Sequence, residues 1–171
     1  MNRNILKLQQ IAVAPYRIII GLMSGTSLDG LDIALCKFTN SGLNTTIKTL
    51  HFKTVNYTPE FKLELRSISS QPTVDLQKVT LLNAYIGTYF ADLILQSLEE
   101  WGFKAEDVDL IASHGQTIFH APISIHGLKS YPNATLQIGD GDHIAVKTGI
   151  ITLSDFRQKN IAAGGEGAPL A

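Results

Sequence analysis

Two apolar runs near the N-terminus, residues 18–23 and 31–38, are separated by only seven residues. The first run is almost uninterrupted, as expected for a strand covered on both faces, and the second also has β character. Residues 45–55 are rich in β-branched side chains and follow the turn-like Asn40, Ser41 and Gly42, which predicts a third strand. The N-terminal region is therefore expected to form a three-strand antiparallel meander.

Helical signals follow this meander. Thr58 before Pro59 is typical of an N-cap with proline at the first helical position, which predicts a short helix. Residues 73–101 then predict a long helix that Gly102 ends, with one buried stripe of Val79, Leu82, Ile86, Tyr89 and Leu93. Further on, strands are expected at residues 108–113, 134–138 and 150–154, and a helix at 142–148. The expected fold class is α/β: a mixed sheet with a crossover helix and flanking helices.

The bulk composition limits the class of partner. A chain of 171 residues with 44% hydrophobic residues is long enough for one domain, which we place at residues 16–171 after an N-terminal extension, 1–15, without clear periodicity. The net charge of -1 gives no global field to attract nucleic acid or anionic lipid, so a small molecule is the expected partner. The single cysteine, Cys36, and the absence of a signal peptide or membrane span in the sequence predict a cytoplasmic location.

The connection between the first two strands has the composition of an anion-binding turn. It offers two glycines that allow positive φ, two hydroxyls and one carboxylate in the sequence Gly25, Thr26, Ser27, Leu28, Asp29 and Gly30. Its amides could converge on a phosphate while Asp29 holds Mg²⁺ through water. An ordinary hairpin explains the same composition equally well. A P-loop is excluded because the turn has no Walker lysine.

Polar side chains also follow two later strands. His114 and Gln116 come directly after the strand predicted at 108–113, and Arg157 follows the one predicted at 150–154. Because α/β sheets bind ligands at the carboxyl ends of their strands, we expect ligand contacts from these residues. A histidine at a strand end is more often a structural hydrogen bonder, and Arg157 could instead pair with Asp155 at the surface. The spacing of His114, His120 and His126 does not favour a zinc site.

Four segments in order resemble the anhydro-N-acetylmuramic acid kinase family: IGLMSGTSLDGLD at residues 20–32, ASHGQTIFH at 112–120, LQIGD at 136–140 and DFRQKNIAAGGEGAPL at 155–170. The resemblance runs from about Tyr16 to the last residue. It implies the actin-like fold, in which two ribonuclease-H-like lobes enclose ATP and substrate. This chain resembles the first lobe, with the second lobe absent.

The resemblance also implies roles for individual residues. Residues 25–32 would bind the nucleotide, with Asp29 near Mg²⁺ and with Leu31 and Asp32 completing the segment, while His114, Gln116 and Arg157 would contact the sugar. The implied reaction opens 1,6-anhydro-N-acetylmuramic acid with water and transfers phosphate from ATP, giving N-acetylmuramic acid 6-phosphate in cell-wall recycling. Its general base is expected beyond Ala171, so no catalytic residue is assigned here and the isolated chain is expected to be inactive.

Three positions depart from the family pattern. Relatives commonly have aspartate at the position of Asn160 and glutamine at that of Glu166, and many have proline at that of Gly141. The changes at Asn160 and Glu166 concern substrate choice, whereas the change at Gly141 concerns the local turn. Two alternative functions therefore remain open: a non-catalytic nucleotide-binding or interaction protein built on the same lobe, and a kinase for another sugar. A homodimer is compatible with the sequence, which does not determine the oligomeric state.

Overall fold

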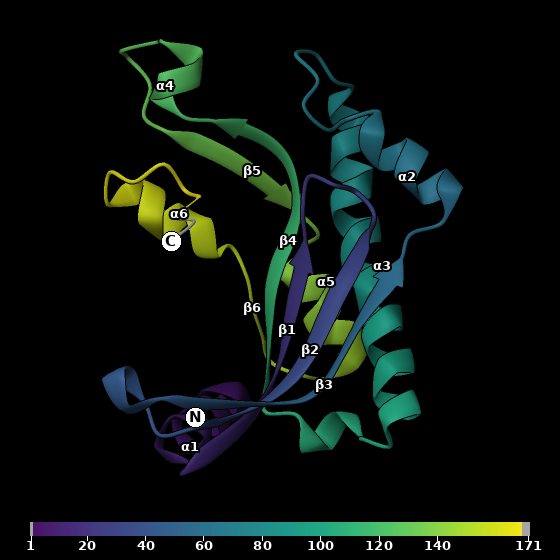
Figure 1. Ribbon diagram of the computed structural model, residues 1–171, viewed down its shortest axis with the longest axis vertical. Coiled ribbons are helices and arrows are strands. Elements are labelled where there is room, and N and C mark those ends of the chain that lie inside the picture. The colour runs from purple at the N-terminus through teal and green to yellow at the C-terminus, as the bar shows by residue number, and fades with distance from the viewer. Residues whose placement is uncertain (1, 169–171) are drawn as a thin grey trace.

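The N-terminal apolar runs form three consecutive antiparallel strands, β1 (Tyr16–Ser24), β2 (Gly30–Thr39) and β3 (Thr46–Asn56). The computed structural model describes residues 2–168. Its sheet continues with β4 (Leu110–Ala121), β5 (Ala134–Ile138) and β6 (Thr152–Leu153). The strand order is β3-β2-β1-β4-β5, and β6 also pairs with β4 (Figure 1). The predicted α/β class and the three-strand meander are confirmed.

Two helices carry the chain from β3 back to the other side of β1. The side chain of Thr58 accepts a hydrogen bond from the Phe61 N–H and begins α2 (Pro59–Arg66). Asp75 caps α3 (Leu76–Trp101) in the same way, and Gly102 ends it in the left-handed conformation. The next strand, β4, lies parallel to β1. This is the crossover helix that the sequence predicts.

The main core lies between one face of the sheet and the long helix. Alternate residues of the strands point into it, and α3 contributes its predicted stripe. Its fully buried side chains include Ile20, Leu31, Ile33, Leu35, Ile86, Phe90, Ile94 and Ile111. Of the stripe residues, Leu82, Ile86 and Leu93 are buried, while Val79 and Tyr89 are partly exposed. The two-residue period of the strands and the helical period of α3 both place apolar side chains in this core, so their packing fixes α3 against the sheet.

Strand β4 differs from its prediction. We expected a strand that ends at residue 113, but β4 continues to Ala121. Its first half pairs in parallel with β1 and its second half pairs antiparallel with β5. Gly115 has a φ of 74°, and the register with β1 shifts between Leu22 and Ser24. The glycine therefore makes a bulge that bends the strand instead of ending it.

The remaining helices are short, and the last strand is shorter than expected. The remaining helices are α4 (Ile123–His126), α5 (Gly141–Thr148) and α6 (Phe156–Ala162). Two 3-10 turns lie at Gly42–Asn44 and Ala105–Asp107. Helix α5 confirms the prediction for residues 142–148, whereas β6 has only two of the five residues expected at 150–154. In Figure 1, α2, α3 and α5 lie on one side of the sheet and α6 lies on the other.

The N-terminal extension is helical, although its sequence showed no clear period. Helix α1 (Arg3–Val13) begins at Asn2, whose side chain accepts a hydrogen bond from the Asn4 N–H. The Arg17 guanidinium donates to the carbonyls of Ile11 and Ala12 at the end of α1. The Ile11 carbonyl also accepts from the N–H of Ala14, so the end of α1 is satisfied partly by its own cap and partly by a residue of β1. Within residues 2–168, no helix combines the length and hydropathy needed to cross a membrane.

Candidate functional site

The connection between β1 and β2 presents an exposed polar tip on a buried support. Thr26 and Ser27 are exposed, whereas Leu28 is buried and has a φ of 55°. The sequence offers two glycines that allow positive φ, but neither Gly25 nor Gly30 adopts it, and Leu28 does so instead. Gly30 is required for another reason: a Cβ there would lie 2.6 Å from the Val55 carbonyl oxygen of β3.

The tip combines hydrogen-bond donors with one carboxylate. Within residues 2–168, the N–H groups of Thr26 and Ser27 have no protein acceptor. The Ser27 hydroxyl donates to Asp29 Oδ1 over 2.5 Å, and this bond holds the pKa of Asp29 below its ordinary value. The carboxylate is therefore ionised at neutral pH and fully exposed. Such a tip can offer amide and hydroxyl donors to an anion and carboxylate oxygen to a hydrated cation.

The predicted nucleotide segment does not form one cluster of side chains. Leu31 is fully buried in the core. Asp32 is on β2, where its Oδ1 accepts a hydrogen bond of 2.5 Å from Thr54, and it lines a shallow apolar groove that also includes Met23. The exposed chemistry of the segment thus comes from residues 25–29, and Leu31 and Asp32 connect that tip to the sheet.

Gln116 is fully buried directly behind this tip. Its amide nitrogen donates to the carbonyls of Gly25 (2.9 Å) and Thr117 (3.0 Å), and its oxygen accepts from the Ser24 hydroxyl. Ser24 also shares a hydrogen bond of 2.6 Å with the buried Tyr57 hydroxyl. The side chain therefore supports the hairpin in this structure. A sugar contact by Gln116 stays a prediction.

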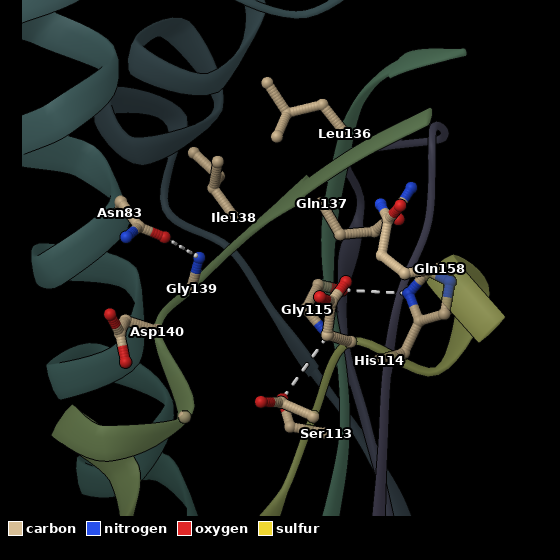
Figure 2. A pocket seen from close by; sticks show the side chains of 13 residues that line it. Asn83, Ser113, His114, Gly115, Leu136, Gln137, Ile138, Gly139, Asp140 and Gln158 are labelled. Atoms are coloured by element: carbon tan, nitrogen blue, oxygen red, sulfur yellow. Dashed lines mark hydrogen bonds between the residues drawn. The ribbon is translucent and has the colours of Figure 1, made fainter. Parts of the chain in front are cut away.

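A cavity of about 290 Å³ opens beside the bulge of β4 (Figure 2). It is formed by the bulge, the β5–α5 turn, the β6–α6 turn and one residue of α3. Its lining residues are Asn83, Ser113, His114, Gly115, Leu136, Gln137, Ile138, Gly139, Asp140, Gly141, Ser154, Asp155 and Gln158. Hydroxyls, amides and two carboxylates thus surround a space between four chain segments that are separate in sequence.

Backbone conformation shapes this cavity. Gly115 and Gly139 have positive φ, and a Cβ on Gly115 would lie 2.8 Å from the Ile138 carbonyl oxygen. The Asn83 side chain accepts a hydrogen bond of 2.9 Å from the Gly139 N–H and fixes the β5–α5 turn to α3 (Figure 2). Asp140 then caps α5 by accepting from the Asp142 N–H. These contacts fix the cavity wall to α3 and α5.

Sequence reasoning did not single out Asn83, Ser154 or Gln158. Asn83 belongs to a long helix and to no motif, and the only available signal was a polar residue next to the buried stripe position Leu82. Gln158 directly follows the predicted site residue Arg157 and Ser154 lies three residues before it, so both could have been found as its neighbours in sequence.

His114 lines this cavity and is hydrogen-bonded to Arg157, which is not itself a lining residue. Arg157 Nε donates to His114 Nε2 over 2.8 Å, and His114 Nδ1 lies 3.0 Å from the Gly115 carbonyl oxygen (for the histidine, see Figure 2). Burial and the neighbouring Arg157 charge lower the pKa of His114, with burial the larger cause. The histidine is therefore neutral near neutral pH. Two of the three residues expected to contact the sugar are thus brought together.

The other histidines of the predicted strand and loop are separate from this pair. His126 Nδ1 accepts from the Leu128 N–H, within the loop after α4. His120 is on the outer half of β4, where it pairs with Thr135 of β5. Among residues 2–168, no group of three or more His, Cys, Asp or Glu side chains is placed to hold a metal ion.

Of the two charge departures, Asn160 lies in α6 and Glu166 lies in the glycine-rich segment that follows it. Asn160 Oδ1 accepts a hydrogen bond of 2.9 Å from the Gly167 N–H, and the Ser124 hydroxyl donates to Glu166 Oε1 over 3.2 Å. Both side chains act here as oxygen acceptors, a role that aspartate and glutamine can also perform. The last two residues of the motif, Pro169 and Leu170, lie outside the described residues.

Comparison with known proteins gives a consistent result. The family model described as anhydro-N-acetylmuramic acid kinase matches residues 17–171. An anhydro-N-acetylmuramic acid kinase of Pseudoalteromonas atlantica is 54% identical over all 171 residues, and one of Pseudoalteromonas translucida is 52% identical over the same length. A relative of the same name from Caldanaerobacter subterraneus is 42% identical over 154 residues, 90% of this chain.

The chain spans less than half the length of these relatives: 43% of each Pseudoalteromonas protein and 39% of the Caldanaerobacter protein. The match nevertheless covers nearly all of the chain and includes the hairpin, the β4 bulge and the β6–α6 turn. The mixed sheet with flanking helices agrees with the actin-like, sugar-kinase fold of this family. We conclude that the chain belongs to the anhydro-N-acetylmuramic acid kinase family.

Proposed function

We propose that residues 16–171 are the first lobe of an ATP-dependent kinase that converts 1,6-anhydro-N-acetylmuramic acid and water to N-acetylmuramic acid 6-phosphate. The carrying observation is that the exposed hairpin tip and the polar cavity are joined through a single strand segment. Gln116 bonds the Gly25 carbonyl, while its neighbours His114 and Gly115 line the cavity. A phosphate donor at the tip and a sugar in the cavity would therefore rest on one rigid support.

The hairpin fits the phosphates of ATP. Phosphate oxygens accept hydrogen bonds, and the tip supplies the Thr26 and Ser27 amides and the Thr26 hydroxyl. Asp29 adds an ionised, exposed carboxylate whose Oδ1 is already used by Ser27. It suits a Mg²⁺ ion held through water. Bound Mg²⁺ neutralises phosphate charge, which the tip cannot do alone because residues 25–30 include no lysine or arginine.

The cavity fits an amino sugar. Its lining alternates amides, hydroxyls and carboxylates, the groups that hydrogen-bond sugar hydroxyls and an acetamido group. Arg157, hydrogen-bonded to the cavity residue His114, would supply a positive charge for the lactyl carboxylate or for the transferring phosphate. Gln116 supports the hairpin from behind.

Turnover requires more than this chain supplies. Opening the anhydro ring needs a general base for water, a contribution of about 10²- to 10⁴-fold, and the family resemblance assigns that base to an aspartate outside these residues. We therefore expect the 171-residue chain to bind MgATP weakly and to form no product.

A chimaera tests the proposed function. Residues 1–171 are fused to the remaining part of the Pseudoalteromonas atlantica relative, and product is followed with isotope-labelled 1,6-anhydro-N-acetylmuramic acid. We expect ATP-dependent N-acetylmuramic acid 6-phosphate from the chimaera and none from the chain alone. A chimaera that folds but forms no product, beside an active full-length relative, would contradict the proposal.

The same assay separates the alternatives. A kinase for another sugar would consume ATP with other hexoses at least as fast as with the anhydro sugar. A non-catalytic nucleotide-binding protein would bind MgATP through the hairpin but give no turnover with any sugar in the chimaera.

A further inference from the structure

The Arg157 guanidinium is oriented by a histidine and by no carboxylate. Its Nε donates to His114 Nε2 over 2.8 Å. Within residues 2–168, Arg157 makes no salt bridge, and neither of its terminal nitrogens, Nη1 and Nη2, has a protein acceptor. Because a guanidinium is planar, fixing Nε also fixes the direction in which the two terminal nitrogens point.

The contacts of His114 require one tautomer. The Gly115 carbonyl oxygen can only accept, so Nδ1 must carry the proton in that hydrogen bond. Arg157 Nε can only donate, so Nε2 must be unprotonated. The ring is therefore the neutral Nδ1–H form, and Gly115 is the residue that determines this. The positive φ of Gly115 at the β4 bulge allows its carbonyl to lie beside the preceding side chain.

We propose that His114 is a positioning residue that, as the neutral Nδ1–H tautomer, holds Arg157 so that its terminal nitrogens receive an oxyanion of the substrate. The inference rests on the proposed function for the identity of that anion. A carboxylate and a phosphoryl group share the required chemistry, two oxygens that accept two parallel N–H donors. His114 itself does not touch the reacting atoms.

The arrangement also makes anion binding depend on pH. Protonation of His114 places a hydrogen on Nε2, which removes the acceptor for Arg157 and puts two cations side by side. The ionisable groups around this pair are Asp155 beside Arg157, Asp140 across the cavity and Asp32 on β2. The pKa of His114 lies below its ordinary value, so the pair is intact at neutral pH and is lost as the pH falls.

The test uses the 171-residue chain with isotope-labelled histidine and arginine. NMR gives the His114 tautomer from its ring nitrogen shifts and the exchange rate of the Arg157 Nε–H. N-acetylmuramic acid and inorganic phosphate are then titrated separately, with N-acetylglucosamine as the matched sugar without a carboxylate. Affinities are compared for the natural chain, His114→Leu, which has no acceptor, and His114→Gln, which can return an oxygen to the position of Nε2.

We expect NMR to show the Nδ1–H tautomer and a slowly exchanging Arg157 Nε–H. The affinity for N-acetylmuramic acid or phosphate should fall about tenfold in His114→Leu, because that variant loses one hydrogen bond to a charged group. His114→Gln should restore most of it. The affinity for N-acetylmuramic acid should fall with pH in the natural chain but not in His114→Gln, because the carboxyl itself titrates well below this range.

An Nε2–H tautomer, or an Arg157 Nε–H that exchanges like that of an exposed arginine, would overturn the proposal even if the leucine variant fails to fold. Equal anion affinity in His114→Leu and the natural chain would also overturn it. If the tautomer is as stated but the natural chain binds neither anion, the oxyanion part of the proposal is wrong. Failure of the chimaera to turn over while these results hold would count against the proposed reaction alone.

Discussion

Replacing Gln116 by leucine removes the polar support behind the hairpin while keeping a similar side-chain volume. The amide nitrogen no longer donates to the Gly25 and Thr117 carbonyls, and the Ser24 hydroxyl loses its acceptor. Ser24 retains its contact with the Tyr57 hydroxyl. The change therefore leaves two carbonyl oxygens without this donor in a region that the bulk solvent does not reach freely.

The magnitude follows from those groups. A buried polar group left unsatisfied costs about 1–3 kcal/mol. Gly25 is only partly buried, so water can reach its carbonyl and its cost lies at the lower end. We expect the free energy of unfolding to fall by about 2–4 kcal/mol. For a chain of this size, the melting temperature should then fall by about 4–16 °C. Leucine also adds apolar burial, which offsets part of the loss.

Urea unfolding followed by circular dichroism measures this difference. Gln77→Leu is the matched control, because Gln77 is exposed on α3 and should change the free energy of unfolding by less than about 0.5 kcal/mol. Gln116→Glu keeps the acceptor for Ser24 but turns a second oxygen toward the Gly25 carbonyl, so it should be at least as destabilising as leucine at neutral pH. Equal stability of Gln116→Leu and Gln77→Leu would refute the reasoning.

Three further predictions concern single residues. Gly30→Ala should lower the free energy of unfolding by about 1–3 kcal/mol, because the added Cβ would meet a carbonyl oxygen of β3. Gly21→Ala should not lower it, because no heavy atom lies within 4 Å of a Cβ at that position, and the urea midpoints of the two variants test the difference. The pKa of His114 is lower in the folded chain than in the unfolded chain, so the unfolded chain binds more protons as the pH falls. The free energy of unfolding should therefore decrease from about pH 7 to about pH 5, and His114→Gln should weaken this pH dependence. Asn160→Asp should retain, and Asn160→Ala should lose, hydrogen-exchange protection at the Gly167 N–H, since only aspartate keeps the acceptor; equal protection in both would contradict this.

The parts of the fold that depend on local periodicity could be predicted. The meander, the cap at Thr58, the long helix and its end at Gly102 all follow from neighbouring residues. Helix α1 was missed because its C-terminal carbonyls are satisfied from outside by Arg17. The length of β4 was misjudged because Gly115, which usually interrupts a strand, makes a bulge that two different partner strands stabilise.

In the candidate site, too, local features could be predicted from the sequence and contacts between distant residues could not. The hairpin could be located from composition, but the positive φ at Leu28 could not, because burial of that side chain in the core stabilises the conformation. The contacts of Gln116 with Ser24 and Gly25 and of His114 with Arg157 join residues far apart in sequence. Pairings of this kind depend on the sheet register, which short motifs do not reveal.

Mapping both ligands on the labelled chain tests the central claim most directly. MgATP and N-acetylmuramic acid are added separately, and backbone amide shifts are followed across residues 2–168. We predict that MgATP perturbs the amides of Thr26, Ser27 and Asp29, whereas the sugar perturbs those of Gly115, Gly139 and the β6–α6 turn. Thr26→Ala and Ser27→Ala should weaken the first response and leave the second unchanged. The claim is contradicted if saturating MgATP leaves the chemical shifts of the hairpin amides unchanged. It is also contradicted if the sugar perturbs amides away from the cavity instead.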